Sequence, residues 1–99
     1  MAAYIISDVT ARDPEAFEAY RTRAEASIAQ YGGRYLVRGG PIEVLEGTWP
    51  RHLVVVVEFP DAERARQWYD SLEYAAALEF RDAGLSRNLI LVEGVRPQS

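Results

Sequence analysis

Apolar and polar residues alternate along this chain with two periods, one of two residues and one of about three and a half. Residues 3–10 are mostly β-branched, aromatic or small, which favours a strand. The stretch RDPEAFEAY then begins a helix, because Asp13 can cap it and Pro14 fits its first turn. Gly32 and Gly33 end this helix. Its apolar positions recur at helical spacing, at Phe17, Tyr20, Ala24, Ile28 and Tyr31.

The rest of the chain predicts three further strands and a second helix. Tyr35 to Glu46 reads as a strand interrupted by glycine and proline, and Arg51 to Phe59 as the strongest strand of the chain. A helix follows Pro60. The spacing of its apolar residues changes near Asp70, which predicts a bend with Ser71 as a new N-cap. We expect this second helix to end at Gly84. The stretch RNLILVEGV is the last predicted strand.

The resulting order, β-α-β-β-α-β, predicts the fold class and the domain organisation. It is the ferredoxin-like α+β arrangement, one antiparallel sheet with two helices on one face, in a single domain spanning residues 1–99. Such a sheet normally leaves its other face polar. Leu53 to Val57 and Ile90 to Val92 are instead apolar at both odd and even positions. We therefore expect a homodimer through sheet faces; the alternative is a small exposed apolar patch.

Composition excludes several classes of function. The net charge is −4 and the chain has no lysine, so nucleic acid is not an expected partner. No apolar run is long enough to span a membrane and no signal peptide is recognisable, so we expect a cytoplasmic protein. The chain has no cysteine, one histidine and no dinucleotide-binding glycine pattern. We expect neither a metal nor an organic cofactor.

Several short motifs together resemble a known family. GGRYLVRGG, VLEG, EFPD, WYDSLEY and LVEGV resemble the domain-of-unknown-function family 1330, which is similar to the dimeric α+β barrels. Those include cofactor-free monooxygenases and small lactone isomerases. The resemblance implies a ferredoxin-like fold whose sheets pair face to face in a dimer, and it implies no particular activity. Leu72 stands where members of the family carry proline, so the bend in the second helix is expected to be softer.

Gly39-Gly40-Pro41 is predicted to bend a strand and not to bind an anion. A phosphate cradle needs backbone N–H groups at a helix N-terminus, whereas these residues precede another strand segment and Pro41 has no N–H. A bulge here would redirect Arg38. That arginine either pairs with Glu46, Glu58 or Glu93, or faces a cavity and binds a ligand.

Three side chains are weak candidates for moving a proton. His52, the one histidine, begins the strongest strand, and a solvent-exposed position is the simpler reading. In a strand, alternate residues point to opposite faces of the sheet. Asp8 and Glu58 lie on the less uniformly apolar face of their strands, so we expect both to point away from the helices. A buried carboxylate can act as a base, but each of these can equally pair with an arginine.

A second group of residues is predicted to line a cleft between the sheet and the helices. Arg38 and Arg81 can hold an anionic group, since a guanidinium binds carboxylates in a two-pronged geometry. Trp49, Tyr69 and Tyr74 can wall a pocket for a flat molecule, whereas Trp68 is expected in the core. Arg81 follows Tyr74 by seven residues and is expected on the same side of one helix.

Two classes of function remain open from the sequence. The first is a non-catalytic dimer that binds a small polar or aromatic molecule. The second is a cofactor-free oxygenase or isomerase acting on a small, partly aromatic acid. Whether the protein is an enzyme is not decided by its residues alone.

Overall fold

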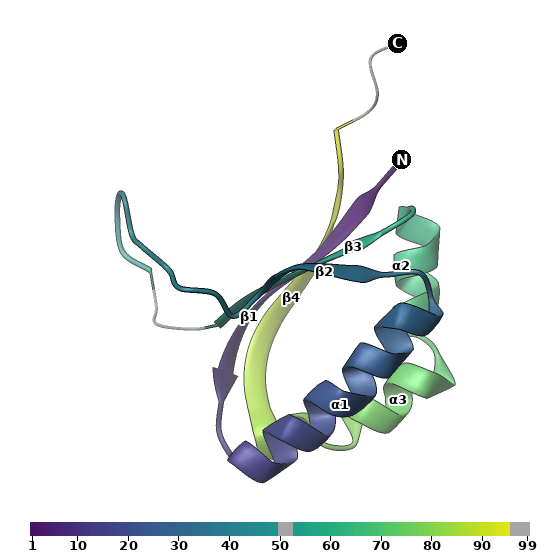
Figure 1. Ribbon diagram of the computed structural model, residues 1–99, viewed down its shortest axis with the longest axis horizontal. Helices are drawn as coiled ribbons and strands as arrows, with labels where there is room; N and C mark the ends of the chain where they lie inside the picture. Colours follow the sequence, from purple (N-terminus) through teal and green to yellow (C-terminus); the bar gives the residue numbers. More distant parts are fainter. Residues whose placement is uncertain (50–52, 96–99) are drawn as a thin grey trace.

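The computed structural model describes residues 1–49 and 53–95. Within them the helices and strands are β1 (Ala3–Ala11), α1 (Pro14–Gln30), β2 (Arg34–Arg38), β3 (Leu53–Phe59), α2 (Ala62–Tyr69), α3 (Leu72–Leu78), α4 (Arg81–Gly84) and β4 (Leu85–Glu93). The four strands form one sheet in the order β2-β3-β1-β4, and all neighbouring strands are antiparallel. The helices lie together on one face of this sheet (Figure 1). The predicted ferredoxin-like α+β fold is confirmed.

The N-termini of α1 and α3 are capped by the side chains that the sequence pointed to. The backbone N–H of Ala16 donates to Asp13 Oδ2 at 2.9 Å, and that of Tyr74 donates to Ser71 Oγ at 3.0 Å. The predicted bend at Ser71 is therefore confirmed. The continuous helix expected from there to Gly84 is wrong. The N–H of Phe80 donates to the carbonyl of Ala77, three residues back, and this tighter turn separates α3 from α4.

The predicted strand over residues 35–46 is much shorter in the structure, and its bulge lies elsewhere. β2 ends at Arg38, so Gly39-Gly40-Pro41 follows the strand instead of interrupting it. Gly39, at φ 73°, still donates its N–H to the carbonyl of Val54. The chain then leaves the sheet, and residues 40–49 form a loop that extends away from the rest of the molecule (Figure 1). The start of the next predicted strand, at Arg51, lies outside the described residues.

The bulge that does exist lies at Leu36 and decides where β2 points its side chains. Tyr35 is opposite Val57 and Val37 is opposite Val56, so Leu36 is the extra residue. Because one residue is inserted, Tyr35 and Arg38 face the same side although they are three positions apart. That side is the helix-covered face.

Both faces of the sheet carry apolar side chains, as the sequence predicted, but the helices cover only one of them. The helix-covered face is buried, with Ile5, Val9, Val57 and Phe59 in the core together with Trp68 of α2. The other face, called the outer face below, remains apolar and open in one chain. Its described apolar residues, by strand register, are Tyr4, Ile6, Val37, Val54, Val56, Ile90 and Val92.

Candidate functional site

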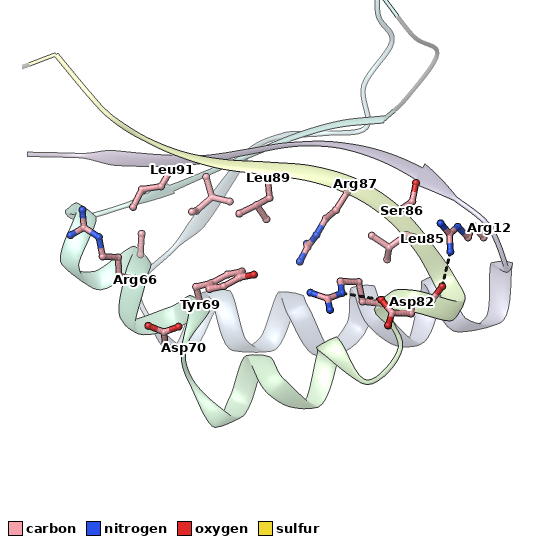
Figure 2. A pocket seen from close by; sticks show the side chains of 13 residues that line it. Arg12, Arg66, Tyr69, Asp70, Asp82, Leu85, Ser86, Arg87, Leu89 and Leu91 are labelled. Atoms are coloured by element: carbon pink, nitrogen blue, oxygen red, sulfur yellow. Dashed lines mark hydrogen bonds and ion pairs between the residues drawn. The ribbon is translucent and has the colours of Figure 1, made fainter.

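An open cleft of about 670 Å³ lies between β4 and the helices α2 and α4. Its apolar floor is formed by Leu85, Leu89 and Leu91 of β4, and Tyr69 of α2 stands opposite them (Figure 2). A volume of this size is typical of pockets that hold small organic ligands. We call this space the cleft.

The charges that line the cleft are unlike those of the whole chain. Four arginines face two aspartates, a balance of +2, although the chain carries −4. Part of that charge is already engaged, because Arg81 Nε lies 3.3 Å from Asp82 Oδ1 and Arg12 donates to the backbone carbonyl of Asp82 at 3.0 Å. The charge that lines the cleft is therefore positive, in spite of the protein's negative total charge.

Arg87 is the central polar residue of this region. It reaches from β4 into the space between the sheet and the helices (Figure 2). Its guanidinium donates to the hydroxyl oxygens of Tyr20 on α1 and Tyr74 on α3, and these two hydroxyls are 2.6 Å apart. No carboxylate lies within ion-pair distance of Arg87 among residues 1–49 and 53–95. A guanidinium has five N–H donors, so donors remain for a ligand.

The surroundings keep all three members of this cluster in their ordinary charge states. Burial raises the pKa of Tyr74 well above its usual value, and burial likewise raises the pKa of Tyr20. Burial by itself lowers the pKa of Arg87, but its contacts with the two tyrosines outweigh this and raise the pKa. Both hydroxyls thus stay protonated at neutral pH, next to a permanent positive charge.

A second, smaller cavity of about 190 Å³ lies beneath α1 and shares Arg87 with the cleft. We call it the inner pocket. Arg38 lies at this pocket, above the ring of Tyr35 with its Cζ 4.4 Å from the ring centroid. Its charge is paired with Glu25 of α1, a partner that was not among the three considered from the sequence. Glu58 instead pairs with Arg34 at 2.7 Å.

The structure brings together some of the residues predicted to bind a ligand and separates others. Tyr69 and Arg81 both line the cleft, whereas Arg38 lines the inner pocket. Tyr74 is fully buried, so it contributes its hydroxyl to the Arg87 cluster and does not form a pocket wall. Trp49 lies on the loop after β2, is half exposed and lines neither cavity.

Two of the three proton-transfer candidates, Asp8 and Glu58, line neither cavity. Asp8 pairs with Val54 in the β1–β3 register and Glu58 with Tyr4, which places both on the outer face, as expected. His52 lies outside the described residues. A carboxylate base on the outer face is separated from the Arg87 cluster by the sheet itself.

Arg87 was missed in the sequence, although a signal for it exists. It shares strand parity with Leu89 and Leu91, which point toward the helices. An arginine on the apolar parity of a strand needs polar partners inside the fold. Those partners, Tyr20 and Tyr74, are 67 and 13 residues away, so the pattern of β4 alone does not name them.

The sequence matches the model of the family described as domain of unknown function (DUF1330) over residues 2–95. The chain belongs to the DUF1330 family. No curated protein matches it.

Solved structures with the same fold have low sequence identity to this chain. A protein of unknown function from Rhodopseudomonas palustris is 20% identical with a TM-score of 0.75, and 97% of this chain covers 84% of that one. SnoaB from Streptomyces nogalater, a cofactor-independent oxygenase, is 14% identical with a TM-score of 0.69, over 97% of this chain and 95% of that one. A dimeric protein of unknown function with a ferredoxin-like fold from Bacteroides fragilis is 16% identical with a TM-score of 0.61, over 94% and 96%. At these identities the likeness shows the fold.

Two further features of the described residues bear on function. None of the helices in residues 1–49 and 53–95 is long and apolar enough to cross a membrane. The same residues contain no group of three or more histidine, aspartate or glutamate side chains placed to hold a metal ion.

Proposed function

We propose that this protein binds a small, partly aromatic carboxylate in the cleft between β4 and the helices. The carboxylate contacts Arg87, and Arg81 adds a second positive charge. The ring of the ligand packs between Tyr69 and the leucines of β4. The observation that supports this proposal most directly is the Arg87 guanidinium. It lines the cleft, is partly buried, and is partnered by hydroxyl groups and by no carboxylate of residues 1–49 and 53–95.

Energetics favour a ligand with a negative charge at this position. Removing a charged group from water is costly unless an opposite charge or strong hydrogen bonds replace the solvent. The two tyrosine oxygens replace part of that solvent around Arg87. A carboxylate would supply the rest, because it forms charge-assisted and often bidentate hydrogen bonds with arginine.

The test measures benzoate and phenylacetate binding by calorimetry in the wild type and in Arg87→Met. We expect Arg87→Met to lower affinity by about tenfold or more, since each charge-assisted hydrogen bond contributes about 1.5–3 kcal/mol. Arg64→Met is the matched control, because Arg64 is an exposed arginine of α2 that lines neither cavity. Circular dichroism verifies that both variants fold. Equal affinity of the Arg87 and Arg64 variants would contradict the proposed site.

The protein is further proposed to act as a homodimer that buries the outer face of the sheet. Ile90 and Val92 on this face are 54% and 40% exposed in a single chain. Apolar side chains exposed side by side on a sheet are typical of an interface. The similar protein from Bacteroides fragilis is described as dimeric, which supports the same assembly here.

A second function, a cofactor-free oxygenase or isomerase, is favoured by the likeness to SnoaB. In this case Arg87 would hold the acid group of the substrate and stabilise negative charge that develops during the reaction. Asp8 and Glu58 could not serve as the base in the cleft, because both lie on the outer face. Oxygen uptake with a dihydroxybenzoate, lost in Arg87→Met and kept in Arg64→Met, would favour the oxygenase over the binding protein.

A further inference from the structure

The inner pocket is a mostly apolar cavity beneath α1. It is lined chiefly by aliphatic and aromatic side chains of the sheet and α1, among them Ile5, Val9, Phe17, Ala24, Ile28 and Val55. Its volume is about 190 Å³. A cavity of about 150 Å³ lined by such side chains is large enough to hold benzene. The inner pocket therefore has room for one aromatic ring with a small substituent.

One buried hydroxyl in this apolar lining has no hydrogen-bond partner among the residues that the structure describes. Ser7 lies in the middle of β1, opposite Val55 and Leu89, and is only 5% exposed. Within residues 1–49 and 53–95 its hydroxyl makes no hydrogen bond. No fully buried side-chain oxygen or nitrogen is left unpaired in that part of the chain. The Ser7 hydroxyl must therefore be open to the inner pocket, which it lines.

A serine at this position is unusual because buried polar groups are nearly always hydrogen-bonded. The neighbouring side chains on the same face, Ile5 and Val9, are apolar and pack in the core. An alanine in place of Ser7 would avoid the cost of an unpaired hydroxyl. The hydroxyl is accounted for if a ligand supplies its missing partner.

Further donors lie at the pocket in the Arg87 cluster. Arg87 donates to both tyrosine hydroxyls, and one of these hydroxyls donates to the other. One hydroxyl hydrogen is then left over, and Tyr20 lines the inner pocket together with Arg87. The other arginines of the pocket are already paired, Arg38 with Glu25 and Arg21 with Glu18.

We propose that the inner pocket is a second binding site, for a neutral single-ring aromatic molecule that bears a carbonyl oxygen. The ring occupies the apolar part of the cavity, and the oxygen accepts a hydrogen bond from the Ser7 hydroxyl, with the Arg87 cluster as an additional donor nearby. The site differs from the cleft in its ligand, because its lining is mostly apolar and two of its arginines, Arg38 and Arg21, are already paired with carboxylates. It does not depend on carboxylate binding in the cleft.

The probe for this site is acetophenone, compared with α-methylstyrene, which has the same shape but no oxygen. Binding is measured by titration of ¹H–¹⁵N correlation spectra of the uniformly labelled protein. We expect acetophenone to shift the amide signals of residues around Ser7, and Ser7→Ala to weaken its binding by about three- to tenfold. The same variant should leave α-methylstyrene unaffected. Ser86→Ala is the matched control, because Ser86 is exposed and lines the cleft only.

A second variant tests the position of the ring. Ala24→Leu places three further carbon atoms in the inner pocket, since Ala24 is 3% exposed and lines it. We expect it to abolish acetophenone binding and to leave benzoate binding in the cleft unchanged. If acetophenone binds Ser7→Ala as tightly as the wild type, or still binds Ala24→Leu, or does not bind the wild type, the proposal is wrong. Benzoate binding reports separately on the cleft, so the experiments distinguish a failure of this proposal from a failure of the proposed function.

Discussion

At the scale of single residues, the most consequential side chain is Arg87, whose two tyrosine partners come from different helices. Its contacts tie β4 to α1 through Tyr20 and to α3 through Tyr74. The hydroxyl of Tyr74 is completely removed from water. The cluster therefore positions the guanidinium and also holds the helices against the sheet.

Tyr74→Phe should destabilise the fold by about 1.5–3 kcal/mol, the usual contribution of a buried hydrogen bond to a charged group. Urea denaturation at pH 7 measures this difference. Tyr69→Phe is the matched control, because Tyr69 is 41% exposed and its hydroxyl makes no hydrogen bond within the described part of the chain. Equal stability of the two variants would show that the Tyr74 hydroxyl has no structural role.

At the scale of elements, the approach of α4 to α1 fixes the end of the cleft. Gly84 ends α4, and a Cβ added there would lie 2.7 Å from the backbone nitrogen of Phe17 and 2.8 Å from the carbonyl carbon of Ala16. Gly84 also accepts a hydrogen bond from the N–H of Arg12 at 2.8 Å. Only a residue without a side chain lets the two helices come this close.

Gly84→Ala should therefore destabilise the protein by about 1–3 kcal/mol, since the backbone of α1 has to move to admit the methyl group. It should also weaken benzoate binding, because α4 carries Arg81. Gly40→Ala is the control, as nothing lies within 4 Å of its added Cβ. Thermal unfolding of the two variants compares them directly. A melting temperature of Gly84→Ala that equals that of Gly40→Ala would contradict the close approach.

A second contact between elements joins the end of α1 to the start of α3 and makes stability depend on pH. Tyr31 Oη donates to Glu73 Oε1 at 2.9 Å. The backbone N–H of Glu73 itself and the Tyr31 hydroxyl both lower the pKa of Glu73 below its ordinary 4.5. A carboxylate whose pKa is lowered by folding stabilises the protein above its unfolded pKa, and this contribution is lost as pH falls through the folded pKa.

We therefore expect Glu73→Gln to be less stable than the wild type at pH 7 and the difference to shrink as the pH falls below 4.5. Glu63→Gln is the control, because Glu63 occupies the equivalent second position of α2 and has no tyrosine partner within the described residues. Denaturant titrations at several pH values between 7 and 3 give the comparison. A difference between wild type and Glu73→Gln that is constant over this range would exclude the linkage.

At the scale of the whole molecule, the outer face of the sheet determines the expected assembly. Its centre is apolar, and the Arg34–Glu58 pair lies at the end of the β2–β3 ladder. Within residues 1–49 and 53–95 no helix covers this face, because all the described helices lie on the other side (Figure 1). A second copy that presents the same face would bury it symmetrically.

Ile90→Asp tests this assembly with little risk to the fold, since Ile90 is already 54% exposed in one chain. We expect light scattering at micromolar concentration to give the mass of a dimer for the wild type and that of a monomer for Ile90→Asp, because the variant places an unpaired charge in the interface. Leu72→Asp is the control, as Leu72 is 87% exposed on a helix. A monomeric wild type would rule out the proposed dimer.

The sequence by itself determined the features that depend on neighbouring residues. The helix caps at Asp13 and Ser71 depend only on residues nearby in the sequence, and so does the alternation that turns Val57 and Phe59 of β3 toward the core. Both features could therefore be predicted, and both are confirmed. The end of β2 was misplaced because Gly39-Gly40-Pro41 signals a change of direction without showing whether the chain returns to the sheet.

Only the tertiary structure decided which side chains meet. Arg87 with Tyr20 and Tyr74, Arg38 with Glu25, and the open hydroxyl of Ser7 all depend on segments that are distant in sequence. The bulge at Leu36 shows the physical reason on the smallest scale. One extra residue reverses the side to which every following side chain of β2 points, and only the pairing with β3 reveals it.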